Sequence, residues 1–199
     1  TSRPDLAGAR LIVAHLGSGT SLTAIRDRRS VATTMGFSTL EGPPMSTRSG
    51  SLDPGILLHL LREGMSLATL EDLLYHESGL RGLSGGIGDM AALLDREATD
   101  ADAAFAIACY VYRVQREVGS LAAALGGLDA LVFTGGIGEK SAVIRARIVE
   151  GLRWLGMALD TRANEAGAAV ITPPSSAILG TVIATDEEVV IARATRALS

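Results

Sequence analysis

The sequence has few of the residues that mark several common classes of protein. Cysteine occurs once in 199 residues, at Cys109, so one copy of the chain cannot form an internal disulfide. Aromatic residues are scarce, and no apolar run is long enough to span a membrane. The lack of a disulfide framework is typical of a reducing compartment, and we therefore expect a cytoplasmic protein. Cys109 stands in a helical stretch among apolar neighbours, which predicts an unreactive core residue.

The charge balance excludes further classes of partner. The formal net charge is −4, which gives no reason to expect nucleic acid or an anionic membrane as a partner.

Residues 1–4 do not form a signal peptide, and without an initiator methionine they resemble a cut end or a linker. Because 47% of the residues are hydrophobic, the chain can build a substantial core in one large domain or two small ones.

Several catalytic and cofactor patterns are absent as well. The sequence has no His/Cys cluster with zinc-ligand spacing and no Gly-x-Ser-x-Gly nucleophile elbow. The glycines after residue 134 fit neither standard nucleotide fingerprint. A Walker loop needs Gly where Glu139 stands, and the dinucleotide pattern needs Gly where Ser141 stands. A nucleotide bound here must therefore be held by a motif other than a Walker loop or the dinucleotide-binding glycine pattern.

The most informative stretch that is present covers residues 131–141. An apolar run predicts a buried strand, a turn containing Gly135, Gly136 and Gly138 follows, and a helical pattern begins near Val143. The start of a helix offers unpaired N–H groups, and glycine lets the backbone approach a ligand closely, so the stretch is a candidate anion site. A tight turn that binds nothing accounts for the same pattern.

A second glycine turn, Gly17-Ser18-Gly19, joins two predicted strands, and His15 precedes it. Two glycine turns on strand ends suggest phosphate handling, which also needs a cation and a metal-binding carboxylate. Arg48, in the Gly/Pro-rich segment 41–50, and Glu187, in the first turn of the last predicted helix, are candidates. Each has a simpler interpretation. Arg48 could be an ordinary solvated arginine of a loop, and Glu187 could be a carboxylate that complements the dipole at the start of its helix.

Residue periodicity predicts an α/β fold with a mixed sheet. Strands are expected at 11–16, 21–25, 30–37, 131–133, 169–172 and 178–184, and helices from Asp53, from a capping box at 69–72, over 99–125, from 143 to Trp154, and from Thr185 to 198. Residues 79–89 are expected to form a glycine-rich loop, and Trp154 is expected in the core or an interface. The helix-rich segment 53–125 suits a subdomain inserted between halves of the sheet.

Five motifs resemble those of one known family. They lie at 15–21, 34–54, 78–80, 133–139 and 186–188, and they occur in the order found in the C-terminal half of the acetate and propionate kinase family. The resemblance covers the chain from about residue 11 to its end. It implies the actin/Hsp70/sugar-kinase (ribonuclease H-like) fold, in which two related lobes enclose ATP, with the N-terminal lobe absent here.

The resemblance also implies roles for individual residues. The nucleotide-binding positions would be His15, Leu16, Gly17, Ser18 and Gly19 at the hairpin tip, Asp89, Met90 and Ala91 on the adenine side, and Gly135, Gly136, Ile137, Gly138 and Glu139 at the adenosine turn. Arg48 matches the family arginine that contacts the transferring phosphoryl group, and Glu187 matches the carboxylate associated with Mg²⁺. The implied reaction is phosphoryl transfer between ATP and acetate, which gives ADP and acetyl phosphate.

Two departures from the family pattern lie at the expected nucleotide site. The family commonly has Asn where Ser18 stands, and usually has Arg where Ala91 stands. Because the N-terminal lobe supplies further active-site groups, we expect the isolated chain to be inactive. The C-terminal lobes of this family pair, so a homodimer is expected. A non-catalytic nucleotide-binding or dimerisation module and a propionate or butyrate kinase remain alternatives.

Overall fold

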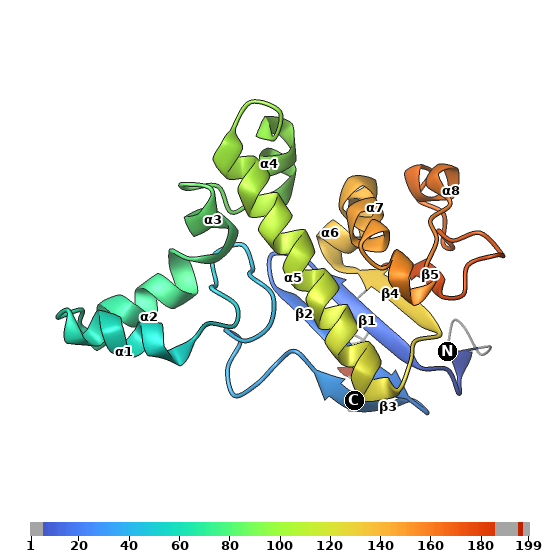
Figure 1. The fold of residues 1–199 in the computed structure, drawn as a ribbon, viewed down its shortest axis with the longest axis horizontal. Coiled ribbons are helices and arrows are strands. Elements are labelled where there is room, and N and C mark those ends of the chain that lie inside the picture. Colours follow the sequence, from blue (N-terminus) through green and yellow to red (C-terminus); the bar gives the residue numbers. More distant parts are fainter. Residues whose placement is uncertain (1–5, 186–194, 197–199) are drawn as a thin grey trace.

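One mixed sheet of five strands forms the centre of the molecule (Figure 1). The computed structural model describes residues 6–185 and 195–196. Three strands form an antiparallel meander, and two more extend it in parallel with the first, in the order β3-β2-β1-β4-β5. The strands are β1 (Leu11–Leu16), β2 (Thr20–Arg26), β3 (Arg29–Thr33), β4 (Ala130–Thr134) and β5 (Leu179–Val182). The expected mixed sheet is therefore present.

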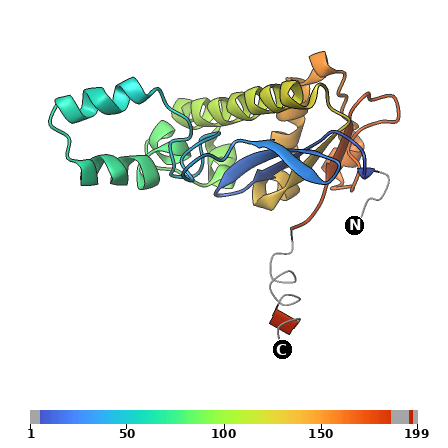
Figure 2. The same ribbon diagram turned by 90° about the horizontal axis from the view of Figure 1, so that it is seen from below.

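Five helices connect β3 to β4, and the remaining helices connect β4 to β5. They are α1 (Pro54–Arg62), α2 (Leu67–His76), α3 (Gly79–Leu83), α4 (Met90–Arg96), α5 (Ala101–Leu125), α6 (Gly135–Lys140), α7 (Ala142–Glu150), the 3₁₀ helix η2 (Arg153–Leu155) and α8 (Thr161–Glu165). Helix α5 runs across the sheet, whereas α1 and α2 project away from it as a hairpin (Figures 1 and 2). No helix in the described part of the chain is long and apolar enough to cross a membrane.

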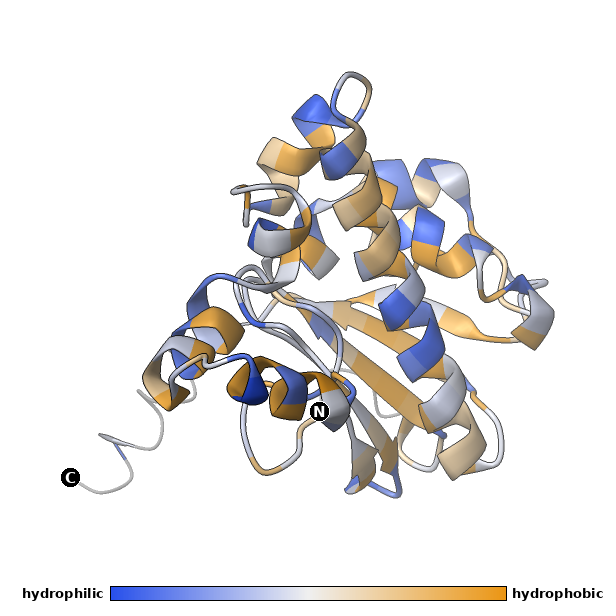
Figure 3. Ribbon diagram, turned by 60° about the vertical axis from the view of Figure 1, so that its left-hand side comes forward, coloured by the Kyte–Doolittle hydropathy of each residue, from blue (hydrophilic) through white to orange (hydrophobic). Residues whose placement is uncertain are grey.

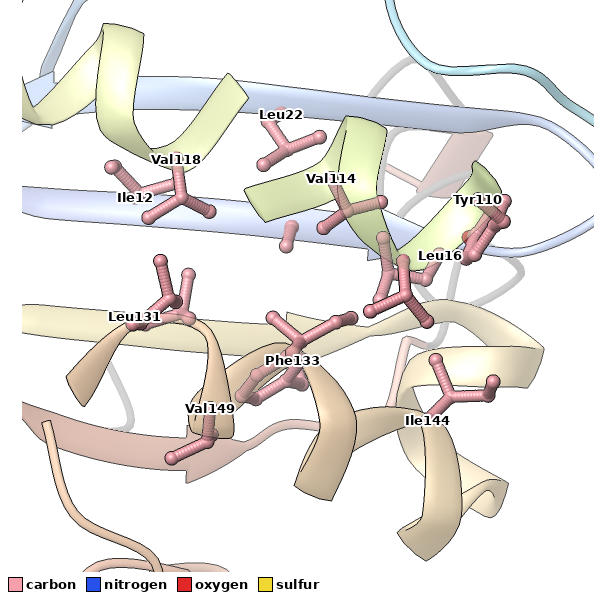
Figure 4. Close-up of a cluster of buried hydrophobic side chains, with 14 of the residues drawn as sticks. Ile12, Leu16, Leu22, Tyr110, Val114, Val118, Leu131, Phe133, Ile144 and Val149 are labelled. Atoms are coloured by element: carbon pink, nitrogen blue, oxygen red, sulfur yellow. The ribbon is translucent and has the colours of Figure 1, made fainter. Parts of the chain in front are cut away.

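The core lies between the sheet and the helices α5 and α7. Strand β1 alternates half-buried and buried residues, so Ile12 and Leu16 face α5, where Val114 and Val118 meet them (Figure 4). Strand β4 is buried along its whole length, as expected for a central strand with parallel neighbours on both sides. This packing fixes the positions of the turns that follow β1 and β4.

Polar side chains define the ends of the helices as the sequence predicts in two cases. Asp53 begins α1, because its carboxylate accepts a hydrogen bond from the Gly55 N–H at 2.8 Å. The long helix was expected from residue 99, but α5 starts at Ala101 after Asp100 caps it; its end is as predicted, at Gly126, whose φ of 71° glycine readily adopts. The capping box expected at 69–72 is wrong, because α2 begins earlier and Ser66 accepts from the Thr69 N–H.

The strand expected at 169–172 is also wrong. It contributes only an isolated bridge between Val170 and Thr181. The Thr172 hydroxyl accepts the Gly180 N–H at 3.0 Å, and Pro173 cannot donate to a ladder, so pairing stops there. The segment 79–89, expected as a loop throughout, contains the short helix α3.

Three smaller expectations are also revised. The helix expected to run from 143 to Trp154 stops at Glu150, and η2 follows it. Trp154 lies outside the core of this chain, with 71% of its surface exposed. Cys109 is only partly buried. The prediction that 53–125 is an inserted subdomain stays a prediction, and the helix expected from Thr185 to 198 lies almost entirely outside the described residues.

Candidate functional site

The two predicted glycine turns lie side by side. Strands β1 and β4 are parallel, with His15 opposite Thr134, so both strands end at the same edge of the sheet. The hairpin tip, residues 17–19, follows β1, and α6 follows β4. A cleft of about 630 Å³ opens at this edge. Ligands of open α/β sheets bind in this kind of place, beyond the carboxyl ends of the strands.

Ten of the predicted nucleotide-site residues line this cleft. They are His15, Gly17, Ser18, Gly19, Asp89, Met90, Ala91, Gly135, Gly136 and Ile137. Three others do not line it. Leu16 is fully buried, Gly138 is buried, and the Glu139 carboxylate accepts a hydrogen bond from the Gly135 N–H. The sequence therefore identified three separate segments that the fold brings to one cleft.

The close contact between the two turns requires glycine. Gly135 has φ of 77°, and a Cβ atom there would lie 2.7 Å from the backbone oxygen of Leu16. At the hairpin tip, the Gly17 N–H donates to the Gly19 oxygen at 3.0 Å. A Cβ atom on Gly17 would lie 3.9 Å from the Gly136 nitrogen. The glycines thus allow two backbones to meet at the floor of the cleft.

Arg48 lies beside the hairpin tip rather than along the cleft wall. Its loop is tied to the tip by the Ser46 N–H, which donates to the Ser18 oxygen at 3.0 Å. A Cβ atom on Gly19 would lie 3.8 Å from the Arg48 Nη1 atom. The described contact of the guanidinium is a weak one, from Nη1 to the Met45 sulfur at 3.7 Å. Arg48 therefore has donors available for an anion at the tip.

Glu139 joins the turn after β4 to the segment after β5. Its Oε1 atom accepts from the Thr185 N–H at 2.9 Å, from the Thr185 hydroxyl at 2.8 Å and from the Gly135 N–H at 2.9 Å. The hydrogen bonds from Thr185, followed by that from Gly135, hold the pKa of the Glu139 carboxyl below its usual range despite partial burial. Glu139 thus connects two segments instead of facing the cleft.

A buried arginine forms hydrogen bonds to the backbone of the same turn. Arg145 is 1% exposed. Its Nη1 atom donates to the backbone oxygens of Gly138 and Glu139, and its Nε and Nη2 atoms donate to the side chain and backbone of Asn164, all within 2.8–3.0 Å. Burial lowers the pKa of the guanidinium, which still keeps its proton at neutral pH. Sequence patterns had not singled out Arg145, because it looks like an ordinary helix-surface arginine.

Helix α4 supplies the third wall of the cleft. Asp89 begins this helix by accepting the Ala92 N–H at 2.9 Å, which places Ala91 and Leu94 along the cleft. Lys140, Ser141 and Thr185 also line it and had not been predicted. Lys140 and Ser141 directly follow the glycine turn at 135–138, but proximity does not distinguish a lining residue from a buried one, and Thr185 has no such signal.

The predicted metal ligand lies outside the part of the chain that the structure describes. Glu187 lies outside the described residues, and within the described ranges no group of three His, Cys, Asp or Glu residues is arranged to hold a metal ion. Asp89 is the one described carboxylate that lines the cleft.

Comparison with known proteins identifies the relatives of this chain. The model of the Acetokinase family matches residues 3–193, which is nearly the whole sequence. The chain belongs to the Acetokinase family. The acetate kinase of Methylocella silvestris is 54% identical over 98% of this chain and 48% of its own length. The acetate kinase of Rhodopseudomonas palustris (strain TIE-1) is 52% identical over 96% of this chain and 49% of its own length.

Solved structures agree with this assignment to the Acetokinase family. The Porphyromonas gingivalis acetate kinase matches with a TM-score of 0.90 at 36% identity, over 96% of this chain and 49% of that one. A propionate kinase from Francisella tularensis matches with a TM-score of 0.88 at 41% identity, over 93% and 48%. The chain thus spans about half the length of its relatives. The predicted α/β fold class is confirmed, and it is consistent with an actin/Hsp70/sugar-kinase-like lobe.

Proposed function

We propose that this chain is the C-terminal, nucleotide-binding lobe of an acetate kinase. In the whole enzyme, ATP would transfer its γ-phosphoryl group reversibly to acetate, giving ADP and acetyl phosphate. The observation that carries the proposal is the cleft in which the hairpin tip, the turn at α6 and the start of α4 meet. Family membership supports the reaction type, since the named relatives are acetate kinases.

The residues at the cleft would supply the separate binding and charge-stabilising roles that phosphoryl transfer requires. Backbone N–H groups of the tip at 17–19 would bind the terminal phosphates, because glycines expose the backbone there. Arg48, beside Gly19, would stabilise charge on the transferring phosphoryl group. The apolar side chains of Met90 and Ile137 would face the nucleoside. These roles need positioning rather than covalent chemistry.

We propose Mg²⁺ as the metal, with Glu187 as its protein carboxylate. Mg²⁺ usually keeps several waters and binds one or two carboxylates together with substrate phosphates. A single carboxylate near the phosphates is therefore a sufficient protein contribution. The ion would neutralise phosphate charge when bound.

Nucleotide binding by the chain itself tests the proposal. We expect ADP with Mg²⁺ to bind in isothermal titration calorimetry, and Gly136→Leu to abolish binding because its side chain would enter the cleft. Gly8→Leu is a matched control, because a Cβ atom at either glycine has no protein atom within 4 Å. Binding that survives Gly136→Leu as fully as Gly8→Leu contradicts the proposed site.

The isolated chain should not catalyse phosphoryl transfer from ATP to acetate. Groups contributed by the N-terminal lobe are needed to position acetate and exclude water. An acetyl phosphate assay with the chain, ATP, Mg²⁺ and acetate should give no rate above background, and adding the lobe as a separate chain should restore one. Rates with propionate and butyrate in the restored enzyme decide between acetate and the longer acids.

We also propose that the lobe forms a homodimer in the cytoplasm. An apolar groove lies beside the α1–α2 hairpin, and Ile56, which lines it, is 49% exposed. Much of the ribbon of this hairpin has the orange colour of hydrophobic residues (Figure 3). An exposed apolar groove of this kind favours burial in an interface. Ile56→Glu should convert the dimer to a monomer in analytical ultracentrifugation, whereas Leu58→Glu, at 54% exposure and outside the groove, should not. A monomeric unsubstituted chain contradicts the proposal.

A further inference from the structure

One lysine lines the cleft among the residues that the structure describes. Lys140 is the only lysine in the sequence, and it lines the cleft. Its side chain is exposed and forms no ion pair within the described part of the chain. An unpaired ammonium group in a ligand cleft is available to donate hydrogen bonds to the ligand.

The position of Lys140 separates it from the phosphate end. Helix α6 starts where Gly135 meets Leu16, beside the hairpin tip. Lys140 lies four residues beyond Gly136, about 6 Å further along the helix axis. The neighbouring wall is apolar, because Met90, Leu94 and Ile137 line it. A flat base suits this end of the cleft, and phosphates suit the glycine end.

The chemistry of lysine distinguishes between purines. An ammonium group has three donors and no acceptor. Guanine and hypoxanthine carry an oxygen at C6 beside N7, so two acceptors face the same side, whereas adenine carries a donor amino group there. The described carboxylate of this wall, Asp89, uses Oδ1 to accept the Ala92 N–H. A donor-only side chain such as Lys140 at the base end therefore favours a 6-oxopurine over adenine.

We propose that Lys140 shifts the base preference of the cleft toward 6-oxopurine nucleotides by donating to the oxygen at C6. The proposal rests on the nucleotide binding proposed above. It concerns the ratio of two affinities, so it does not depend on how tightly nucleotides bind overall. Because Lys140 is exposed, its replacement leaves the core packing unchanged.

Calorimetric dissociation constants for ADP and IDP, both with Mg²⁺, test the proposal. IDP lacks the 2-amino group of GDP, so it isolates the change at C6. Lys140→Met should lower the ratio of the ADP to the IDP dissociation constant about tenfold, as expected for one hydrogen bond from a charged donor. Lys140→Arg retains donors and should keep the ratio. Arg162→Met removes the same charge from α8, outside the cleft, and should also keep it.

A second measurement needs no substitution. Because the chain has a single lysine, an amine-acylating reagent modifies Lys140 and the chain terminus, which peptide mass spectrometry separates. IDP should protect Lys140 more than ADP does at equal site occupancy. If both nucleotides bind and Lys140→Met leaves the ratio unchanged, the base-preference proposal is wrong and the nucleotide site stands. If neither nucleotide binds the unsubstituted chain, both proposals fall.

Discussion

Replacement of Arg145 by Met should destabilise the fold far more than replacement of Arg147, which lies on the same helix. Arg145 is 1% exposed and donates four hydrogen bonds, two to the turn at Gly138 and Glu139 and two to Asn164. Methionine fills a similar volume, so the substitution removes the donors without opening a large cavity. Four oxygen acceptors, three of them in buried hydrogen bonds, then lose their partner.

The magnitude follows from those four acceptors. A typical hydrogen bond contributes about 1 kcal/mol net, and one to a charged group contributes more. Relief from burying a guanidinium without a carboxylate partner offsets part of the loss. We therefore expect Arg145→Met to lower the free energy of unfolding by about 3 kcal/mol. Arg147 forms an ion pair with Glu97 that is 39% exposed on the arginine side, so Arg147→Met should cost about 1 kcal/mol or less.

Urea unfolding followed by circular dichroism measures both losses, as shifts of the midpoint at a constant slope. Equal losses for Arg145→Met and Arg147→Met would refute the reasoning. A second measurement separates support of the turn from general stability. At a temperature where both variants are folded, Arg145→Met should weaken ADP binding more than Ile148→Ala, which removes a fully buried side chain of the same helix. Equal affinities of the two folded variants would show that Arg145 acts on stability alone.

The remaining predictions concern the turn and the response to pH. Gly135→Ala should lower the free energy of unfolding by about 2 kcal/mol, because φ is 77° and the added Cβ meets the Leu16 oxygen. Gly136→Ala, which has free space, should leave it unchanged in the same urea titration, and equal losses would contradict this. The hydrogen bonds from Arg10 hold the pKa of the Asp129 carboxyl below its usual range. As pH falls, Asp129 therefore takes up a proton in the unfolded chain before it does so in the folded chain. The free energy of unfolding should consequently decline from about pH 5 downward. Asp129→Asn should make that decline shallower, and an unchanged slope contradicts the assignment.

The sequence predicted the elements whose causes are local. Asp53 before Pro54 and Gly126 after an apolar helix mark helix ends through backbone chemistry that needs no tertiary contact. The strand expected at 169–172 failed because the Thr172 hydroxyl takes the Gly180 N–H, eight residues away, which no local pattern reveals. Trp154 was expected in the core or an interface because it is large and apolar, yet it is 71% exposed in this chain. An interface for Trp154 stays a prediction.

The sequence predicted ten residues that line the cleft, but it did not predict the hydrogen bonds that hold these segments in place. Three motifs distant in sequence line one cleft, because parallel pairing of β1 and β4 brings both glycine turns to one edge. The turn 135–139 was first interpreted as an anion site built from helix N–H groups. In the structure the Gly135 N–H already donates to Glu139, whose carboxylate also accepts from Thr185.

An anion near Gly135 would therefore compete with a carboxylate of the chain itself. If a nucleotide binds as proposed, its outer phosphates would be held mainly by the hairpin tip and Arg48. The turn instead contributes shape: Gly135 permits the close approach to β1, and Arg145 fixes the carbonyls of Gly138 and Glu139. Glu139 ties the turn to Thr185, two residues before Glu187. The described hydrogen bonds of this glycine turn therefore join it to Thr185 and to Arg145.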